Sequence, residues 1–269
     1  MTFRPKQNNI LAALAERRVP LGLQVSIPHP SVIEILASTG FDFYMLCMEH
    51  ARVDVGQMEH CIRAADAAGI TTIVRVAENN RTLIRQAVEA GAQGIVIPQI
   101  QSREDAKKAV DAVRYPPEGK CGMCPAIRAA NYSKASWDEY LEHSRTQTMV
   151  IPLIEGREGV EHADEILAEL KPEVDAVGVG RGDLAQDITK PGEKVDFFHP
   201  FLAEAHRNVL TLAARRGIPL MDMAWPNYNV EDAKRLLSIG VKIMLYNVDQ
   251  FLFYDLCQEI VHQLKKTGK

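Results

Sequence analysis

Seven side chains that directly follow short apolar runs are the best candidates for chemistry in this sequence. In parallel α/β folds, residues at the carboxyl ends of buried strands build the active site. Each charged residue among them, taken alone, is equally compatible with a solvated loop charge or a helix cap, so the prediction rests on their convergence. The seven are Cys47, Glu49, His50, Arg75, Glu155, Asp183 and Trp225.

Glu155 and Asp183 are the candidates for binding a metal ion. Two carboxylates on neighbouring strand ends offer hard oxygen ligands and leave room for water and substrate, which suits Mg²⁺ or Mn²⁺. Catalytic zinc would require imidazoles or thiolates, and these are missing beside the two carboxylates. Asp183 also stands near the start of a predicted helix, GDLAQDI, so an N-cap role is the alternative.

Three polar groups near these carboxylates suit an anionic substrate. Gly180 and Gly182 precede the predicted helix, where free backbone N–H groups bind carboxylates; with Gly178 they do not fit the dinucleotide-binding fingerprint. His50 is the acid–base candidate, because the imidazole group in general titrates near neutral pH. Arg75 provides a permanent planar donor for a carbonyl or carboxylate group.

Two absences narrow the chemistry. No lysine ends a predicted strand, since Lys242 begins the eighth, and this disfavours a Schiff-base mechanism. The loops after the seventh and eighth strands contain no glycine, so the usual phosphate site of barrel enzymes is missing. The sequence therefore predicts a small, unphosphorylated anionic substrate.

One unit recurs along the chain: an amphipathic helix, a glycine and a short aliphatic strand. Glycine directly after a helix adopts the left-handed conformation that ends it, and strands alternating with helices predict a parallel sheet. Eight such strands favour a (β/α)₈ barrel, with a doubly wound sheet as the alternative. The predicted strands are 20–25, 42–47, 71–75, 94–98, 149–154, 175–180, 218–223 and 241–246.

Three segments lie outside this repeat, within what is interpreted as a single domain, 1–269. The helix predicted over 8–17 would close the bottom of the barrel. The helix over 248–266 would either cover the barrel or pack on another subunit. The connection 99–148 is too long for an ordinary loop of a compact domain and is interpreted as functional.

Composition sets the broad class. The net charge of −4 without a dense basic patch excludes nucleic acid and anionic membrane as main partners. No apolar run reaches the ~18 residues that span a bilayer. The five cysteines are an odd number at irregular spacing, which fits a reducing, cytoplasmic location.

An ordered set of motifs resembles a known family over nearly the whole chain, from Pro20 to Gln263. The motifs are LGLQ, GFDFYML-x-x-EH, TTIVR, EAGAQGIVIPQIQ, RYPPEG, LIEGREG and GVGRGDL. They resemble those of the metal-dependent, pyruvate-specific class II aldolases, which include 4-hydroxy-2-oxoheptanedioate aldolase and 2-dehydro-3-deoxyglucarate aldolase. The citrate lyase β subunits belong to the same superfamily.

The resemblance implies a hexameric barrel, a trimer of dimers, whose C-terminal helix is exchanged between subunits. It implies a divalent ion, Mg²⁺, Mn²⁺ or Co²⁺, held by Glu155 and Asp183 and chelated by pyruvate or its enolate. Arg75 would steady the enolate oxygen, and backbone N–H groups around Gly182 would hold the carboxylate. His50 would remove the hydroxyl proton of a 4-hydroxy-2-oxo acid, so that cleavage gives pyruvate and an aldehyde.

Three positions depart from the family pattern. Cys47 replaces an aspartate that would orient His50, and is interpreted as a packed thiol rather than a nucleophile. Cys121 replaces an arginine after RYPP. Trp225 introduces a bulky apolar group, which suggests a larger or aromatic aldehyde. All three are expected near the acceptor end of the site, whereas the pyruvate end matches the family.

Three further residues are expected to support the site. Glu89 matches a position where the family commonly has an aspartate that reaches a neighbouring subunit's site, and a surface carboxylate is the alternative. Glu49 and Gln99 stand beside the predicted catalytic positions, at the ends of the second and fourth strands.

Two other functions compete with the aldolase. Oxaloacetate-type decarboxylation uses the same enolate and does not need an oriented His50, and the replacement of the aspartate by Cys47 motivates it. A catalytically weakened family member could instead act as a binding or assembly protein. The complete set of Glu155, Asp183, Arg75 and His50 argues against this last hypothesis.

Overall fold

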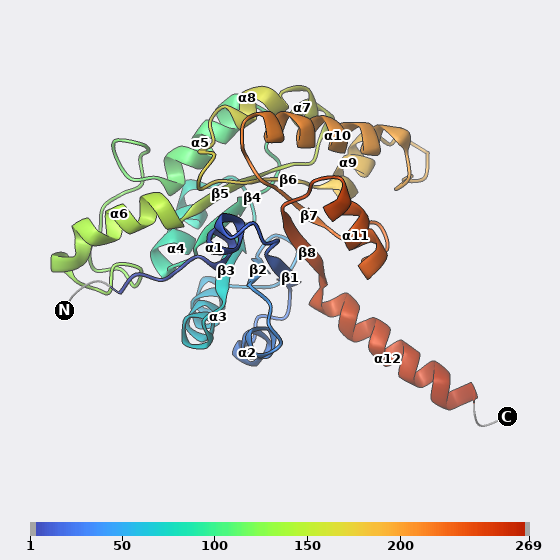
Figure 1. The fold of residues 1–269 in the computed structure, drawn as a ribbon, viewed down its shortest axis with the longest axis horizontal. Helices are drawn as coiled ribbons and strands as arrows, with labels where there is room; N and C mark the ends of the chain where they lie inside the picture. The colour runs from blue at the N-terminus through green and yellow to red at the C-terminus, as the bar shows by residue number, and fades with distance from the viewer. Residues whose placement is uncertain (1–3, 267–269) are drawn as a thin grey trace.

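The computed structural model describes residues 4–266 and shows eight parallel strands closed into one barrel, with β1 to β8 in chain order (Figure 1). The predicted (β/α)₈ barrel is confirmed, and the doubly wound alternative is wrong. Each strand overlaps its predicted range, with ends that differ by at most two residues. The strands are Leu21–Val25 (β1), Phe43–Cys47 (β2), Thr71–Arg75 (β3), Gly94–Ile97 (β4), Met149–Ile154 (β5), Val177–Val179 (β6), Leu220–Met223 (β7) and Ile243–Val248 (β8).

Helices connect successive strands and form the outer layer. Gly69 and Gly91 end two of them with φ of 76° and 101°, a left-handed conformation that side chains resist. Among the described residues, no helix is long and apolar enough to cross a membrane. The helices are Asn9–Ala15 (α1), Pro30–Ser38 (α2), Val55–Ala68 (α3), Arg81–Ala90 (α4), Arg103–Val113 (α5), Trp137–Gln147 (α6), Arg157–Glu161 (α7), Ala163–Leu167 (α8), Arg181–Ile188 (α9), Pro200–Arg215 (α10), Val230–Ser238 (α11) and Asp249–Lys266 (α12), with a 3₁₀ turn at Lys134–Ser136.

Alternating side chains of the strands build two apolar layers, because neighbouring residues of a strand point to opposite faces. Phe43 and Met45 pack inside the barrel, whereas Tyr44 and Leu46 pack outward against the helices. Ile10 of α1 is fully buried in the interior cluster. The predicted closure of the barrel bottom by the first helix is therefore confirmed, and the site is expected at the opposite end.

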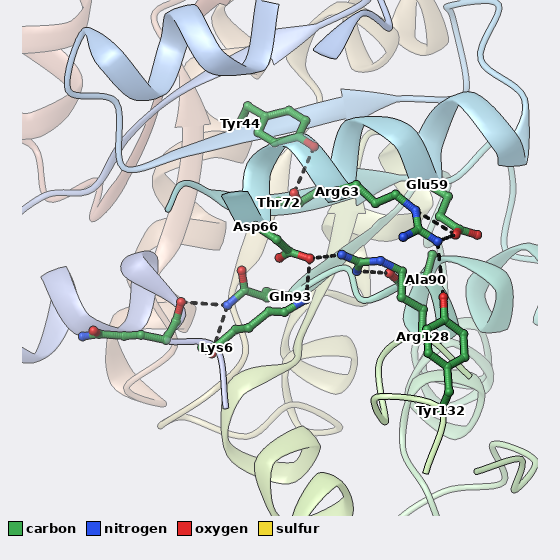
Figure 2. Close-up of polar contacts among 11 residues, drawn as sticks. Lys6, Tyr44, Glu59, Arg63, Asp66, Thr72, Ala90, Gln93, Arg128 and Tyr132 are labelled. Carbon is green, nitrogen blue, oxygen red and sulfur yellow. Dashed lines mark hydrogen bonds and ion pairs between the residues drawn. The ribbon is translucent and has the colours of Figure 1, made fainter. Parts of the chain in front are cut away.

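The N-terminal segment and the long connection are tied to the barrel by one carboxylate, that of Asp66 on α3 (Figure 2). Asp66 pairs with both Lys6 and Arg128. Arg128 also donates a hydrogen bond of 2.8 Å to the carbonyl oxygen of Ala90, the last residue of α4. These contacts fasten the connection at the end of the barrel where the chain enters β4.

The earlier part of this connection lies on the outer helical layer. The backbone N–H of Lys120 donates to the carbonyl oxygen of Asp111 at 2.7 Å, and the Arg81 side chain donates to the Lys120 carbonyl oxygen. The thiol of Cys121 is buried beside Tyr115. Within one chain this stretch therefore packs against the outer helices, and its interpretation as a functional loop stays a prediction.

Helix α12 leads away from the barrel rather than covering it (Figure 1). Its first residue, Asp249, accepts hydrogen bonds from the backbone N–H groups of Ser26 and Ile27, at 3.0 and 2.9 Å. Beyond this anchor the helix exposes large apolar side chains, with Phe253 66% and Leu264 70% exposed. We expected this helix either to cover its own barrel or to pack on another subunit. The first of these two expectations is wrong.

Candidate active site

A cavity of about 330 Å³ lies at the carboxyl ends of the strands. Neither candidate metal ligand lines a larger groove of about 1230 Å³ along α10 and α11. The smaller cavity is therefore the candidate active site. The structure brings six of the predicted site residues to it, namely His50, Arg75, Glu155, Gly182, Asp183 and Trp225.

Glu155 lies directly after β5 and is almost completely buried, with 2% of its surface exposed. Its Oε1 accepts a 2.7 Å hydrogen bond from the backbone N–H of Gln99, so Gln99 supports the site through its backbone. The other oxygen lies against Gly180, where a Cβ atom would approach Oε2 to 2.3 Å. Glycine at this position therefore makes room for the carboxylate.

The surroundings of Glu155 disfavour the ionised form of its carboxyl group. Burial raises the pKa of Glu155 to about 8, and the carboxylates of Asp183 and Glu49 add to the increase, against the hydrogen bond from Gln99 and the charge of Arg75. A cation between Glu155 and Asp183 would reverse this effect, because it favours the ionised form of both carboxylates.

Asp183 lies in the first turn of α9, but it does not cap that helix. The N-cap residue is Gly180, and no side-chain hydrogen bond caps this terminus. The N-cap alternative for Asp183 is therefore wrong. The Asp183 side chain instead lines the cavity, where Glu155 also lies.

The two carboxylates fit a hard divalent cation. Within residues 4–266, no group of three or more His, Cys, Asp or Glu side chains could hold a metal ion. The protein would therefore supply two oxygen ligands and leave the remaining positions to water and to substrate oxygens, a pattern typical of Mg²⁺. Glu155 and Asp183 would hold the ion.

Arg75, at the end of β3, is buried between the carboxylate of Glu49 and the sulfur of Cys47. Its Nε lies 3.2 Å from Glu49 Oε2, and its Nη2 donates to Cys47 Sγ at 3.1 Å. Burial opposes the charge of Arg75, but Cys47 and the carboxylates of Glu49 and Glu155 outweigh it, so the pKa of Arg75 is raised. For Glu49, in contrast, burial raises the pKa of the carboxyl group. Cys47 and Glu49 thus hold the guanidinium in place.

His50 lies at the rim of the cavity, and 58% of its side chain is exposed. Its Nε2 is 3.7 Å from Glu49 Oε2. Cys47 Sγ accepts a 3.3 Å hydrogen bond from the backbone N–H of His50. Cys47 itself is fully buried, as expected of a packed thiol.

None of the five predicted supporting residues lines this cavity, although Cys47, Glu49 and Gln99 contact residues that do. Glu89 is on α4 and pairs with Arg85, with 3.8 Å between Oε1 and Nε. Cys121 is buried under the outer helical layer. The expectation that Cys121 lies near the acceptor end is wrong within one chain, because the connection runs along α4 and α5.

The family follows from a comparison with known proteins. Residues 21–255 match the family model described as HpcH/HpaI aldolase/citrate lyase. This chain belongs to that family. The resemblance inferred from the motifs is confirmed, and the chain is an enzyme of the carbon–carbon lyase class.

Members of the HpcH/HpaI family match the chain over almost its whole length. 5-Keto-4-deoxy-D-glucarate aldolase of Shigella dysenteriae is 29% identical over 260 residues, which cover 96% of this chain and 97% of that protein. A family protein from Burkholderia cenocepacia superposes with a TM-score of 0.86 at 27% identity, covering 96% and 100% of the two chains. A family aldolase from Desulfitobacterium hafniense gives 0.85 at 25% identity, covering 94% and 95%.

The structure adds an aromatic wall that the sequence did not predict beyond Trp225. Tyr228 and Phe251 also line the cavity, and Phe197 packs edge-on against Trp225 with 5.3 Å between the ring centroids. Tyr228 follows Trp225 by three residues in the same loop, and this spacing alone indicates only weakly that Tyr228 belongs to the site. Phe251 belongs to a helix whose apolar residues suggested packing rather than a site.

A buried charge cluster beside the cavity was also missed. Arg181 Nη2 donates to Asp222 Oδ1 at 2.9 Å and to the carbonyl oxygen of Met223 at 3.0 Å. His206 Nε2 lies 2.7 Å from Asp222 Oδ2. The sequence hinted at this cluster only through Asp222, which lies inside a predicted strand, and His206, which lies inside a predicted helix. The cluster joins the first turn of α9 to β7 and α10.

Proposed function

We propose that this HpcH/HpaI family enzyme cleaves, or forms, a carbon–carbon bond of a 4-hydroxy-2-oxo acid to give pyruvate and an aldehyde. The observation that carries the proposal is the presence of Glu155, Asp183 and Arg75 in one cavity with His50 at its rim. We further propose a divalent ion, Mg²⁺, Mn²⁺ or Co²⁺, as the cofactor held by the two carboxylates.

Each residue has a task in this proposal. Glu155 and Asp183 would hold the divalent ion, which would supply positive charge near the developing enolate. Arg75, held by Glu49 and Cys47, donates to the enolate oxygen where negative charge develops. Backbone N–H groups at Gly182 and Asp183, in the first turn of α9, bind the substrate carboxylate. His50 takes the hydroxyl proton at the rim.

The exposed α12 supports an exchange of C-terminal helices between subunits of a hexamer, a trimer of dimers. A helix that exposes a run of large apolar side chains gains stability when a second copy buries them. Glu89 would reach the His50 of a neighbouring subunit only in such an assembly. The five cysteines are free thiols, which supports a reducing, cytoplasmic location.

The test is exchange of the pyruvate methyl protons in D₂O, followed by NMR, since enolate formation alone causes it. We expect exchange with Mg²⁺, Mn²⁺ or Co²⁺ and loss of exchange with EDTA. Glu155→Gln and Asp183→Asn should abolish exchange and metal binding, whereas Glu158→Gln on the exposed surface of α7 should not. Exchange that persists in EDTA would contradict the metal site.

Oxaloacetate decarboxylation is the second candidate. The hydrogen bond from the backbone N–H of His50 to Cys47 Sγ favours it, because the thiol stands where a carboxylate would orient the imidazole, and Glu49 Oε2, at 3.7 Å from Nε2, is beyond hydrogen-bond distance. Pyruvate formed from oxaloacetate, with none from any 4-hydroxy-2-oxo acid, would decide for the decarboxylase.

A further inference from the structure

The geometry points to an aryl aldehyde, of the benzaldehyde type, as the acceptor in the proposed aldol reaction. This inference rests on the proposed function and concerns the part of the cavity beyond the pyruvate site. It comes from the aromatic wall, defined as Trp225, Tyr228 and Phe251, with Phe197 behind it.

The aromatic wall begins at the pyruvate site. The Trp225 indole lies over Gly182, where a Cβ atom would be 3.9 Å from Cη2. From there the rings continue in contact: the Trp225 and Tyr228 centroids are 5.8 Å apart at an interplanar angle of 83°, and those of Tyr228 and Phe251 are 5.5 Å apart at 60°. A substrate whose carboxylate lies at Gly182 would therefore extend along ring faces and edges.

The loop that carries two of these rings is held in an unfavourable backbone conformation. Tyr228 has φ of 53°, in the left-handed region that a bulky residue enters only when its surroundings impose it. Its N–H donates to the Ala224 carbonyl oxygen at 2.6 Å, and Asn247 Nδ2 donates to the Tyr228 carbonyl oxygen at 3.2 Å. Arg235 Nη2 donates to the Trp225 carbonyl oxygen at 2.8 Å. The structure thus holds both rings where they line the cavity.

The charges at this wall disfavour a carboxylated aldehyde. Arg181 is the cationic side chain of the cavity lining next to Trp225, and its charge is balanced by buried Asp222 at 2.9 Å. Arg75, held by Glu49 and Cys47, is assigned by the proposed function to the enolate oxygen and so does not serve a second carboxylate. An aryl group instead gains edge-to-face contacts with aromatic rings, which add to the gain from burying apolar surface.

The reaction balances without a further reactant. In cleavage of a 4-aryl-4-hydroxy-2-oxobutanoate, the C4 hydroxyl loses its proton and the C3–C4 bond breaks. Its electron pair forms the pyruvate enolate, and C4 becomes the carbonyl carbon of the aryl aldehyde. Protonation of the enolate at C3 gives pyruvate. Addition of pyruvate to the aldehyde is the reverse of these steps.

The test compares three aldehydes as acceptors for pyruvate under the same conditions: benzaldehyde, cyclohexanecarbaldehyde of similar size, and glyoxylate, which carries a carboxylate. We expect kcat/KM for benzaldehyde to exceed the other two by about three- to tenfold, the range of aromatic pair energies. Equal or better use of cyclohexanecarbaldehyde or glyoxylate would overturn the inference. Methyl exchange of pyruvate, measured in parallel, separates the two proposals: without it, the proposed function fails first.

Variants of the aromatic wall test the role of individual rings. Tyr228→Leu should lower the ratio of kcat/KM for benzaldehyde over cyclohexanecarbaldehyde by about threefold or more, and Tyr228→Phe should retain it. Phe198→Leu is the matched control, because Phe198 is 75% exposed and does not line the cavity. If Tyr228→Leu lowers kcat/KM for benzaldehyde and for cyclohexanecarbaldehyde by the same factor, the ring only shapes the loop. That result would refute its role in aryl recognition.

Discussion

Replacing Asp222 by asparagine should lower both stability and activity, and the two losses can be separated. Asp222 is 4% exposed and neutralises Arg181, the first residue of α9. Asparagine keeps the shape and one acceptor but removes the charge, so the guanidinium is left buried without a counter-ion. Removing one partner of a buried ion pair costs about 3–5 kcal/mol, and we expect the lower end of this range.

The loss of activity follows from the position of Arg181. Its side chain links the first turn of α9 to β7 through Asp222 and the Met223 carbonyl oxygen. The same turn carries Gly182 and Asp183, so a shift of this turn moves the groups proposed to bind carboxylate and metal. A displacement of about 1 Å at a reacting site costs on the order of 100-fold in rate, and we expect methyl exchange to fall 10- to 100-fold.

A second buried ion pair provides the matched control. Asp175 pairs with Arg114 and accepts from the backbone N–H of Val150 at 2.8 Å, where β5 begins. Asp175→Asn should therefore cost similar stability in urea unfolding without lowering methyl exchange at a temperature where both variants are folded. If Asp222→Asn is destabilised but exchanges at the rate of the unchanged enzyme, the pair does not position α9 and the argument is refuted.

Three further predictions concern pH, the buried thiol and assembly. Burial raises the pKa of Glu155 to about 8, so we expect metal binding to release a proton and the metal affinity to fall about tenfold per pH unit below that value. Calorimetry that shows a constant metal affinity between about pH 6 and pH 8 would contradict this prediction. Cys47→Ala leaves Arg75 Nη2 without its acceptor and should cost about 1–3 kcal/mol in denaturant unfolding, whereas Cys47→Asp should retain the contact. Truncation after Val248 removes α12 and should reduce the sedimentation coefficient to that of a smaller assembly; an unchanged assembly would show that α12 is not exchanged.

The main features of the barrel could be predicted because they depend on short-range patterns. Helix periodicity, a glycine such as Gly69 or Gly91 in the left-handed region, and an aliphatic run that follows it are each legible within a dozen residues. Eight repeats of that pattern imply a closed parallel barrel, and the barrel places the ends of its strands together. This is why Glu155 and Asp183 could be paired before the fold was known.

The surroundings of these residues depend on contacts between distant segments. Arg181 and Asp222 are 41 residues apart, and their pairing depends on the register of β6 and β7. Phe251 reaches Tyr228 only because α12 starts where β8 closes against β1. Cys121 was misplaced because its motif fixes neither the path of a long connection nor the helices on which it packs.

The sequence by itself therefore determined the barrel, the family and the residues at the strand ends, since these follow from local periodicity and ordered motifs. Only the tertiary structure decided the charge of the site, the aromatic wall and the exposure of α12. Burial raises the pKa of Glu155, and the packing of distant segments brings the aromatic rings together. Both depend on neighbours in space rather than on any short stretch of chain.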